Sequence, residues 1–179
     1  MATAKKKTEF FTSPIGVLKY PHLQQPYAYK GEGVEGKPFY STQLILRGGP
    51  ATELKNAVDE ATAAFEKETK KRVKDKTYVE EEDGSLSFRF KVPPEWKDGK
   101  SRRPALFDAD GQPILDAEYP TIGGGTKARI RYSVYCWTFA GKIGVRLELR
   151  AVQIVELAEH ADNSNFGFDP VSAGSEPEF

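Results

Sequence analysis

Apolar and polar residues alternate along most of the chain, and a helical repeat occurs in only one stretch. Apolar residues return every three or four positions at Leu54, Ala57, Val58, Ala61, Ala64 and Phe65. This spacing places them on one face of a helix. We predict a helix over residues 52–71, with Thr52 as its N-cap. Three lysines follow near its C-terminal end, where the helix dipole favours cations: Lys67, Lys70 and Lys71.

The remaining regular segments are predicted strands, because apolar and polar residues alternate there or β-branched and aromatic residues concentrate. They cover residues 16–20, 27–30, 39–46, 86–92, 105–108 with 113–115, 126–137 and 143–156. Turn-forming residues separate them, including Gly141 between the two longest strands. An OB barrel has this order of elements: strands, one helix after the third strand, and then more strands. We predict a mainly β OB fold, a five-stranded Greek-key barrel with extra strands.

Residues 158–179 differ from the rest of the chain. They show no periodicity and are rich in Gly, Pro, Ser, Asn and Asp, a composition typical of disorder. We therefore divide the chain into an OB-fold domain at 1–157 and a flexible acidic tail at 158–179 that ends in Phe179.

The charges of these two parts are opposite. All 26 Lys and Arg residues lie at or before Arg150, which leaves a formal charge of +5 on the body and −5 on the tail. A basic body with an acidic tail indicates a polyanion-binding surface that carries its own electrostatic competitor. An ordinary solvated surface with a frayed terminus would give the same charges.

The most informative alternation runs from Lys127 to Trp137. One face, predicted to enter the core, holds Ala128, Ile130, Tyr132, Val134 and Cys136. The other face holds Lys127, Arg129, Arg131, Ser133, Tyr135 and Trp137. Cations contact phosphates and aromatic rings stack on bases, so this face suits a nucleic-acid strand. In the alternative interpretation the cations are solvated, and Tyr135 and Trp137 cover the mouth of the barrel.

Neighbouring segments carry further cations and a tryptophan. Several cations alternate with other residues in two more strands, at Arg89 and Lys91 and at Arg146 and Arg150. Trp96 lies in a polar loop and either stacks on bases or anchors its loop onto the core. We predict nucleic-acid contacts by stacking from Trp96, Tyr135 and Trp137. Phosphate contacts are predicted from Lys127, Arg129, Arg131, Arg89, Lys91, Lys97, Arg102 and Arg103.

The sequence has no clear motif for catalysis, metal binding or a membrane span. The single cysteine and the two histidines form neither a metal-ligand motif nor a nucleophile–base pair. The glycines at 123–125 precede a predicted strand and lack P-loop spacing. No apolar run approaches the roughly 20 residues of a membrane span. We expect no enzymatic activity and no cofactor, and we interpret four acids as turn residues rather than a nuclease cluster: Asp108, Asp110, Asp116 and Glu118.

Several short motifs, in a fixed order, carry a resemblance to a known family. They are Phe-Thr-Ser-Pro-Ile-Gly at 11–16, Pro-Tyr-Ala-Tyr at 26–29, Phe-Arg-Phe-Lys at 88–91, Pro-Thr-Ile-Gly-Gly-Gly-Thr-Lys at 120–127 before Arg-Tyr-Ser at 131–133, and Gly-Val-Arg-Leu-Glu-Leu at 144–149 with Val-Gln-Ile-Val-Glu-Leu at 152–157. With the acidic C-terminus, these motifs make the chain resemble the single-stranded DNA-binding proteins of T-odd phages, the gene 2.5 protein type, nearly end to end.

The resemblance implies an OB fold and sequence-independent binding of single-stranded DNA in phage replication and recombination. It also implies a homodimer, and a tail that contacts DNA polymerase and helicase-primase; Glu176, Glu178 and Phe179 are the expected contact residues. The five tail acids are sparser than is usual in that family. The expected location is the cytoplasm of the infected bacterium. An RNA-binding or strand-annealing OB protein, and a phage structural or assembly protein, remain alternatives.

Overall fold

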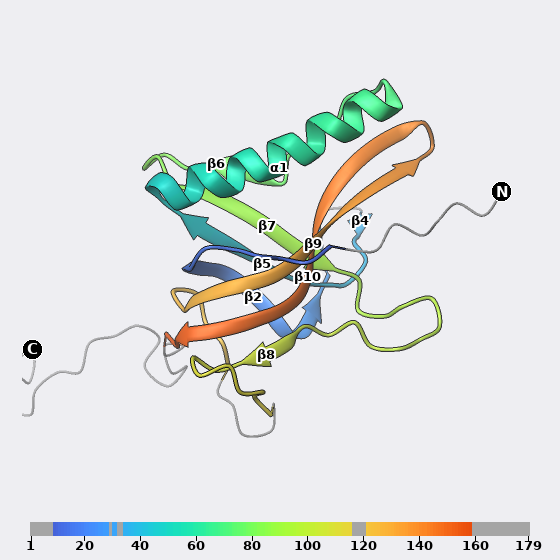
Figure 1. The fold of residues 1–179 in the computed structure, drawn as a ribbon. Coiled ribbons are helices and arrows are strands. Elements are labelled where there is room, and N and C mark those ends of the chain that lie inside the picture. Colours follow the sequence, from blue (N-terminus) through green and yellow to red (C-terminus); the bar gives the residue numbers. More distant parts are fainter. Residues whose placement is uncertain (1–8, 29, 32–33, 116–120, 159–179) are drawn as a thin grey trace, which may run out of the picture.

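Five strands close into a barrel in the computed structural model, which describes residues 9–28, 30–31, 34–115 and 121–158 (Figure 1). The strands are β2 (Gly16–Tyr27), β5 (Phe39–Leu46), β7 (Leu86–Val92), β10 (Lys142–Glu156) and β9 (Lys127–Phe139). Each pairs with the next in this order, and β9 pairs back with β2. Only the pairing of β7 with β10 is parallel in this ring. The arrangement is the predicted OB fold.

Short strands extend the barrel at its edges. They are β1 (Phe11–Thr12) beside β9, β6 (Tyr78–Glu80) beside β7, β8 (Ala105–Phe107) beside β10, and the separate pair β3 (Lys30–Gly31) and β4 (Val34–Glu35). The strand predicted at 16–20 continues to Tyr27 through irregularities of register. Tyr20, with a φ of 50°, lies in the first of them.

The barrel interior follows the alternation of the sequence. Buried and half-buried residues alternate along the whole of β5, and the inward residues of β7 include Phe88 and Phe90, which are fully buried. Ala128, Ile130 and Tyr132 of β9 point into the same core, as predicted. Burial of a large apolar side chain stabilises a fold by about 1.5–3 kcal/mol, so these positions determine which face of each strand points outward.

The alternation of β9 does not continue to its end. Cys136, predicted on the core face, is exposed, and Ser133, predicted outward, is buried. Cys136 is exposed because the β9–β10 hairpin runs past the barrel and projects beside the C-terminal end of α1 (Gly48–Thr69), beyond the main core (Figure 1). Ser133 is buried where its hydroxyl accepts a hydrogen bond from Arg150 of β10 at 3.2 Å. Lys71 connects the two elements by donating a hydrogen bond to the carbonyl of Gly141 at 2.9 Å.

The helix α1 directly follows β5, the strand predicted at 39–46, and covers one end of the barrel with Leu54 and Val58. It begins four residues before the predicted start, so the assignment of Thr52 as N-cap is wrong. Thr52 lies inside the helix and donates to the carbonyl of Gly48 at 3.3 Å. The sequence Gly-Gly-Pro at 48–50 resembles a turn, but a proline in the first turn removes only an N–H that the helix leaves unpaired.

Candidate nucleic-acid interface

Aromatic rings and cations alternate across the outer surface of the barrel. Arg146 of β10 lies opposite Tyr135 of β9, with its guanidinium carbon 5.0 Å from the centre of that ring. The same guanidinium carbon is 6.0 Å from the ring centre of Phe39, and the Nζ of Lys91 is 5.0 Å from that ring centre. A cation at such a distance is attracted by the electron-rich face of the ring. These contacts join β5, β7, β10 and β9 into one surface.

The loop between β7 and β8 brings Trp96 to this surface. Trp96 is 46% exposed, and the guanidinium carbon of Arg102 lies 3.8 Å from its ring centre. The loop turns at Gly99, whose N–H donates to the carbonyl of Trp96 at 2.9 Å and whose φ of 84° favours glycine. Trp96 therefore packs on a cation at the surface, and it does not anchor its loop in the apolar core.

Arg150 continues the series toward the N-terminal end of the described chain. Its guanidinium carbon is 5.4 Å from the ring of Trp96 and 5.6 Å from the ring of Phe10, and Arg131 is 5.9 Å from Phe10. We call the residues of these two series of contacts the cation–aromatic face: Phe10, Phe39, Lys91, Trp96, Arg102, Arg131, Tyr135, Arg146 and Arg150. A cleft of about 770 Å³ runs through it beside Trp96 and Tyr135.

A buried carboxylate lies beneath this face. Glu148 is 4% exposed and accepts hydrogen bonds from Arg102 at 3.2 Å, from Arg146 at 2.7 Å and from Arg150 at 3.3 Å. Burial lowers the pKa of Arg150, and the carboxylate of Glu148 acts in the opposite direction. The three guanidinium groups are thus held in one place by a single anion.

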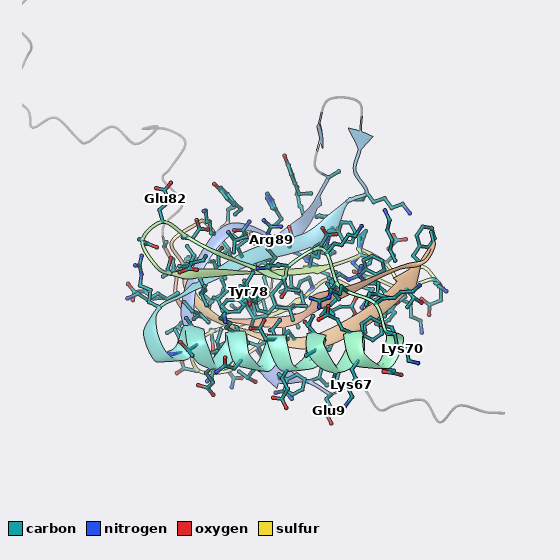
Figure 2. All side chains as sticks on the ribbon, turned by 90° about the horizontal axis from the view of Figure 1, so that it is seen from above. Glu9, Lys67, Lys70, Tyr78, Glu82 and Arg89 are labelled. Carbon is teal, nitrogen blue, oxygen red and sulfur yellow. The ribbon has the colours of Figure 1, made fainter. Side chains whose placement is uncertain are left out.

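A second cleft, of about 880 Å³, lies on the other side of Arg146. Trp137 forms part of its wall, with its indole over Gly144 of the neighbouring strand. Arg89 and Tyr78 both line it, and both side chains are labelled in Figure 2. Its lining cations are Lys55, Lys74, Lys76, Arg89, Lys91 and Arg146. Partial burial, and then repulsion from Arg146 and Arg89, lower the pKa of Lys91.

The predicted cations of β9 are exposed on one face of the strand, as expected, but two of them lie far from both clefts. Their partners are Glu156 for Lys127 at 3.3 Å, Gln153 for Arg129 at 2.6 Å and Thr12 for Arg131 at 2.9 Å. At about 3.3 Å per residue, Lys127 is about 26 Å from Tyr135 along the strand. Arg131 belongs to the cation–aromatic face, whereas Lys127 and Arg129 lie beyond it.

The other predicted site residues divide between the two clefts. Trp96, Lys97, Arg102 and Tyr135 line the first cleft, and Arg89, Lys91 and Trp137 line the second. Arg103 lines neither of them and instead borders a separate hollow with His22 and Thr121. The structure thus gathers most of the predicted residues around Arg146.

Sequence reasoning did not select five residues at the centre of the arrangement: Phe10, Phe39, Arg146, Glu148 and Arg150. The alternation along β10 indicated that Arg146 and Arg150 point outward, and this was sufficient reason to include them among the predicted phosphate contacts. Phe10 and Phe39 lie at or near the ends of short apolar runs, where alternation says little about direction. The burial of Glu148 had no signal, because it depends on an arginine from a separate loop.

Some predicted residues lie outside the described residues, namely Asp116, Glu118, Glu176, Glu178 and Phe179. Asp108 accepts hydrogen bonds from the N–H groups of Asp110 and Gln112, both at 2.9 Å, and so closes a turn. Among the described residues, no three side chains of His, Cys, Asp or Glu form a metal-binding group. In the same part of the chain, no helix is long and apolar enough to cross a membrane.

Comparison with known proteins gives matches to phage single-stranded DNA-binding proteins. The family described as "Single-stranded DNA-binding protein, Bacteriophage T7" has a sequence model that matches residues 51–157. The single-stranded DNA-binding protein of Enterobacteria phage T3 is 30% identical to this chain over 188 residues, which cover 88% of this chain and 79% of the phage T3 protein.

Two solved structures share the fold. One is gp2.5, a single-stranded DNA-binding protein encoded by bacteriophage T7, with a TM-score of 0.69 and 23% identity over 96% of this chain and all of that one. The other is the single-stranded DNA-binding protein from bacteriophage Enc34 in complex with single-stranded DNA, with a TM-score of 0.61 and 15% identity over 84% of this chain and 88% of that one. By the sequence matches, the chain belongs to the T7-type family of phage single-stranded DNA-binding proteins.

Proposed function

We propose that this protein binds single-stranded DNA without strong sequence preference, along the cation–aromatic face. The observation that carries the proposal is the alternation of rings and cations in two series, one around Phe39, Arg146 and Tyr135 and the other around Trp96, Arg150 and Phe10. The two series line one cleft and are joined through Glu148. A DNA strand presents the matching alternation of flat bases and charged phosphates. Stacking is indifferent to base identity because every base has a π face, and each stacked base contributes about 1–3 kcal/mol.

In this proposal Trp96, Tyr135 and Trp137 stack on bases. The phosphate contacts come from Arg89, Lys91, Lys97 and Arg102 in the clefts, and from Lys127, Arg129, Arg131 and Arg103 where the strand continues. Arg102 already covers one face of Trp96, so a base would add to an existing stack of ring and guanidinium. Binding needs no cofactor and no catalytic step.

The role that follows is protection of single strands during phage DNA replication and recombination. A protein that binds unpaired DNA better than the duplex shifts hairpins and displaced strands toward the open form by mass action. The site of action is the cytoplasm of the infected bacterium, where phage DNA is copied. The family membership of the chain supports this role.

The division into a domain at 1–157 and a tail at 158–179 is part of the proposal. A tail of charge −5, attached to a body of charge +5, competes with DNA at high effective concentration. Its terminal residues, Glu176, Glu178 and Phe179, offer charge and an aromatic anchor to a basic, apolar pocket on DNA polymerase or helicase-primase. The protein acts as a homodimer in this account.

Equilibrium titration separates the candidate ligands. We expect oligo-dT to quench the intrinsic tryptophan fluorescence and to bind more tightly than poly-U or duplex DNA, and to remain uncleaved when Mg²⁺ is added. Preferential binding of poly-U would favour the RNA-binding alternative. Absence of binding to all three would leave a structural or assembly protein as the better interpretation.

Truncation tests the tail. A chain that ends at Leu157 should bind oligo-dT more tightly than the full chain at low salt, and the difference should shrink as salt rises. Phe179→Ala should change DNA affinity little and weaken binding to polymerase or helicase-primase. If the truncated chain, still folded, bound DNA more weakly, the tail would not be a competitor.

A further inference from the structure

Glu148 is the one buried charged residue among those that the structure describes. Its two oxygens accept hydrogen bonds from three guanidinium groups, of which Arg146 and Arg150 belong to β10 and Arg102 to the loop. The arginine side chains are themselves 9% to 21% exposed. Such a cluster is a built arrangement rather than a set of mobile surface charges.

The charges in the cluster do not balance. Three guanidinium groups share one carboxylate, which leaves a local excess of two positive charges in a place with little water. Without the carboxylate the three cations would repel one another and turn toward solvent. Glu148 therefore determines where they lie, while the excess charge remains for an anion at the surface.

The hydrogen bonding of the cluster is also incomplete. The Nε–H groups of Arg102 and Arg146 are buried and have no acceptor among the described residues. Buried donors without an acceptor are unfavourable and rare in folded proteins. A small rotation of either guanidinium toward a phosphate oxygen would supply the acceptor, and this fits a site prepared for an anionic ligand.

Glu148 also supports an aromatic ring. Arg102, which it binds, lies 3.8 Å from the ring centre of Trp96, and Arg150 lies 5.4 Å from it. The carboxylate thus holds the guanidinium on which the exposed ring packs. One buried anion orients both the phosphate-binding cations and a stacking ring.

We propose that Glu148 is a positioning residue that strengthens the binding of single-stranded DNA in spite of its negative charge. This inference rests on the proposed function. It predicts a change in DNA affinity opposite to the change that charge alone would cause. Removal of an acid from a DNA-binding surface ordinarily strengthens binding, because repulsion of phosphates is lost. Removal of this acid weakens it, because the guanidinium groups and Trp96 lose their place.

The test compares two substitutions that add the same formal charge. Glu148→Gln should bind oligo-dT about five-fold or more weakly, as expected when a stacking or phosphate contact is lost. Glu95→Gln removes an exposed acid from the same cleft and should bind more tightly than the parent. Glu148→Asp keeps the charge and should recover part of the lost affinity.

A second readout separates positioning from general stability. In a Trp137→Phe background Trp96 is the sole tryptophan, and Glu148→Gln should make its fluorescence more accessible to a soluble quencher. The thermal unfolding curves should show both Gln variants folded at the assay temperature. In the folded parent protein, the Nε–H signals of Arg102, Arg146 and Arg150 should exchange slowly with water and shift when oligo-dT is added.

The outcomes distinguish this inference from the proposed function. If the parent protein does not bind oligo-dT, the proposed function is wrong. If the parent binds but Glu148→Gln binds as tightly or more tightly, Glu148 has no positioning role. If Glu148→Gln does not fold, the parent's arginine signals decide: rapid exchange, or no shift on DNA addition, overturns the inference.

Discussion

The indole of Trp137 lies directly over Gly144, its partner across β9 and β10, so closely that a β carbon at position 144 would overlap the ring. The ring can occupy the wall of the second cleft only because residue 144 is glycine. A substitution at position 144 therefore moves Trp137 without changing any aromatic or charged residue.

Gly144→Ala should displace the indole and weaken oligo-dT binding, by up to the roughly 1–3 kcal/mol that a stacked base contributes. Gly124→Ala is a matched control, since an added β carbon there meets nothing closer than 3.9 Å. Fluorescence titration of both variants, with melting curves, checks this. Parental affinity in a folded Gly144→Ala variant would show that Trp137 serves packing instead.

The two groups of cations can be separated by their salt dependence. Each phosphate contact removed should lower the slope of log K against log salt by about 0.7 for single strands. Arg89→Gln tests the second cleft, whereas Lys127→Gln combined with Arg129→Gln tests the outer part of β9. If the double variant kept the parental slope, the DNA path would be confined to the clefts and would not follow β9.

Lys91 should make DNA binding depend on pH. Its pKa is lowered in the free protein by burial and by Arg146 and Arg89, so it loses its proton below the usual lysine range near 10.4. A phosphate favours the charged form, so binding takes up a proton and the affinity falls as the pH rises through that lowered pKa.

The measurement is the Kd for oligo-dT between pH 7 and pH 10. Lys91→Arg keeps its charge over this range and should lose most of the dependence. An identical pH profile in the parent and in Lys91→Arg would assign the effect to other groups.

The sequence contained enough to predict the barrel, because alternation reports which side of a strand is buried. It correctly placed Ile130 and Tyr132 inside and Arg129 and Tyr135 outside. The same rule misplaced Cys136, because alternation continues in a hairpin after the core has ended. The start of α1 was misjudged for a different reason: Gly-Gly-Pro favours a turn in isolation, whereas here the first helical turn accommodates it.

The proposed interface was predictable only as far as it lies on single strands. Arg146 and Tyr135 meet through strand pairing, and Arg102 reaches Trp96 and Glu148 through the path of a loop. Such contacts between distant segments leave no periodic trace. In the sequence Glu148 stands between two arginines of one strand, a pattern typical of a solvent-exposed residue. Its burial depends on Arg102, which is far away in the sequence.

Mapping of the NMR signals of the 15N-labelled protein during addition of oligo-dT tests the central claim most directly, because it reports where the strand lies. The account predicts that the indole N–H signals of Trp96 and Trp137 shift, together with the backbone amides of Tyr135, Arg146 and Lys91. It also predicts little change along the outer face of α1. Shifts confined to α1 or β8, with both indole signals unmoved at saturating DNA, would contradict the assignment of the cation–aromatic face as the DNA-binding surface.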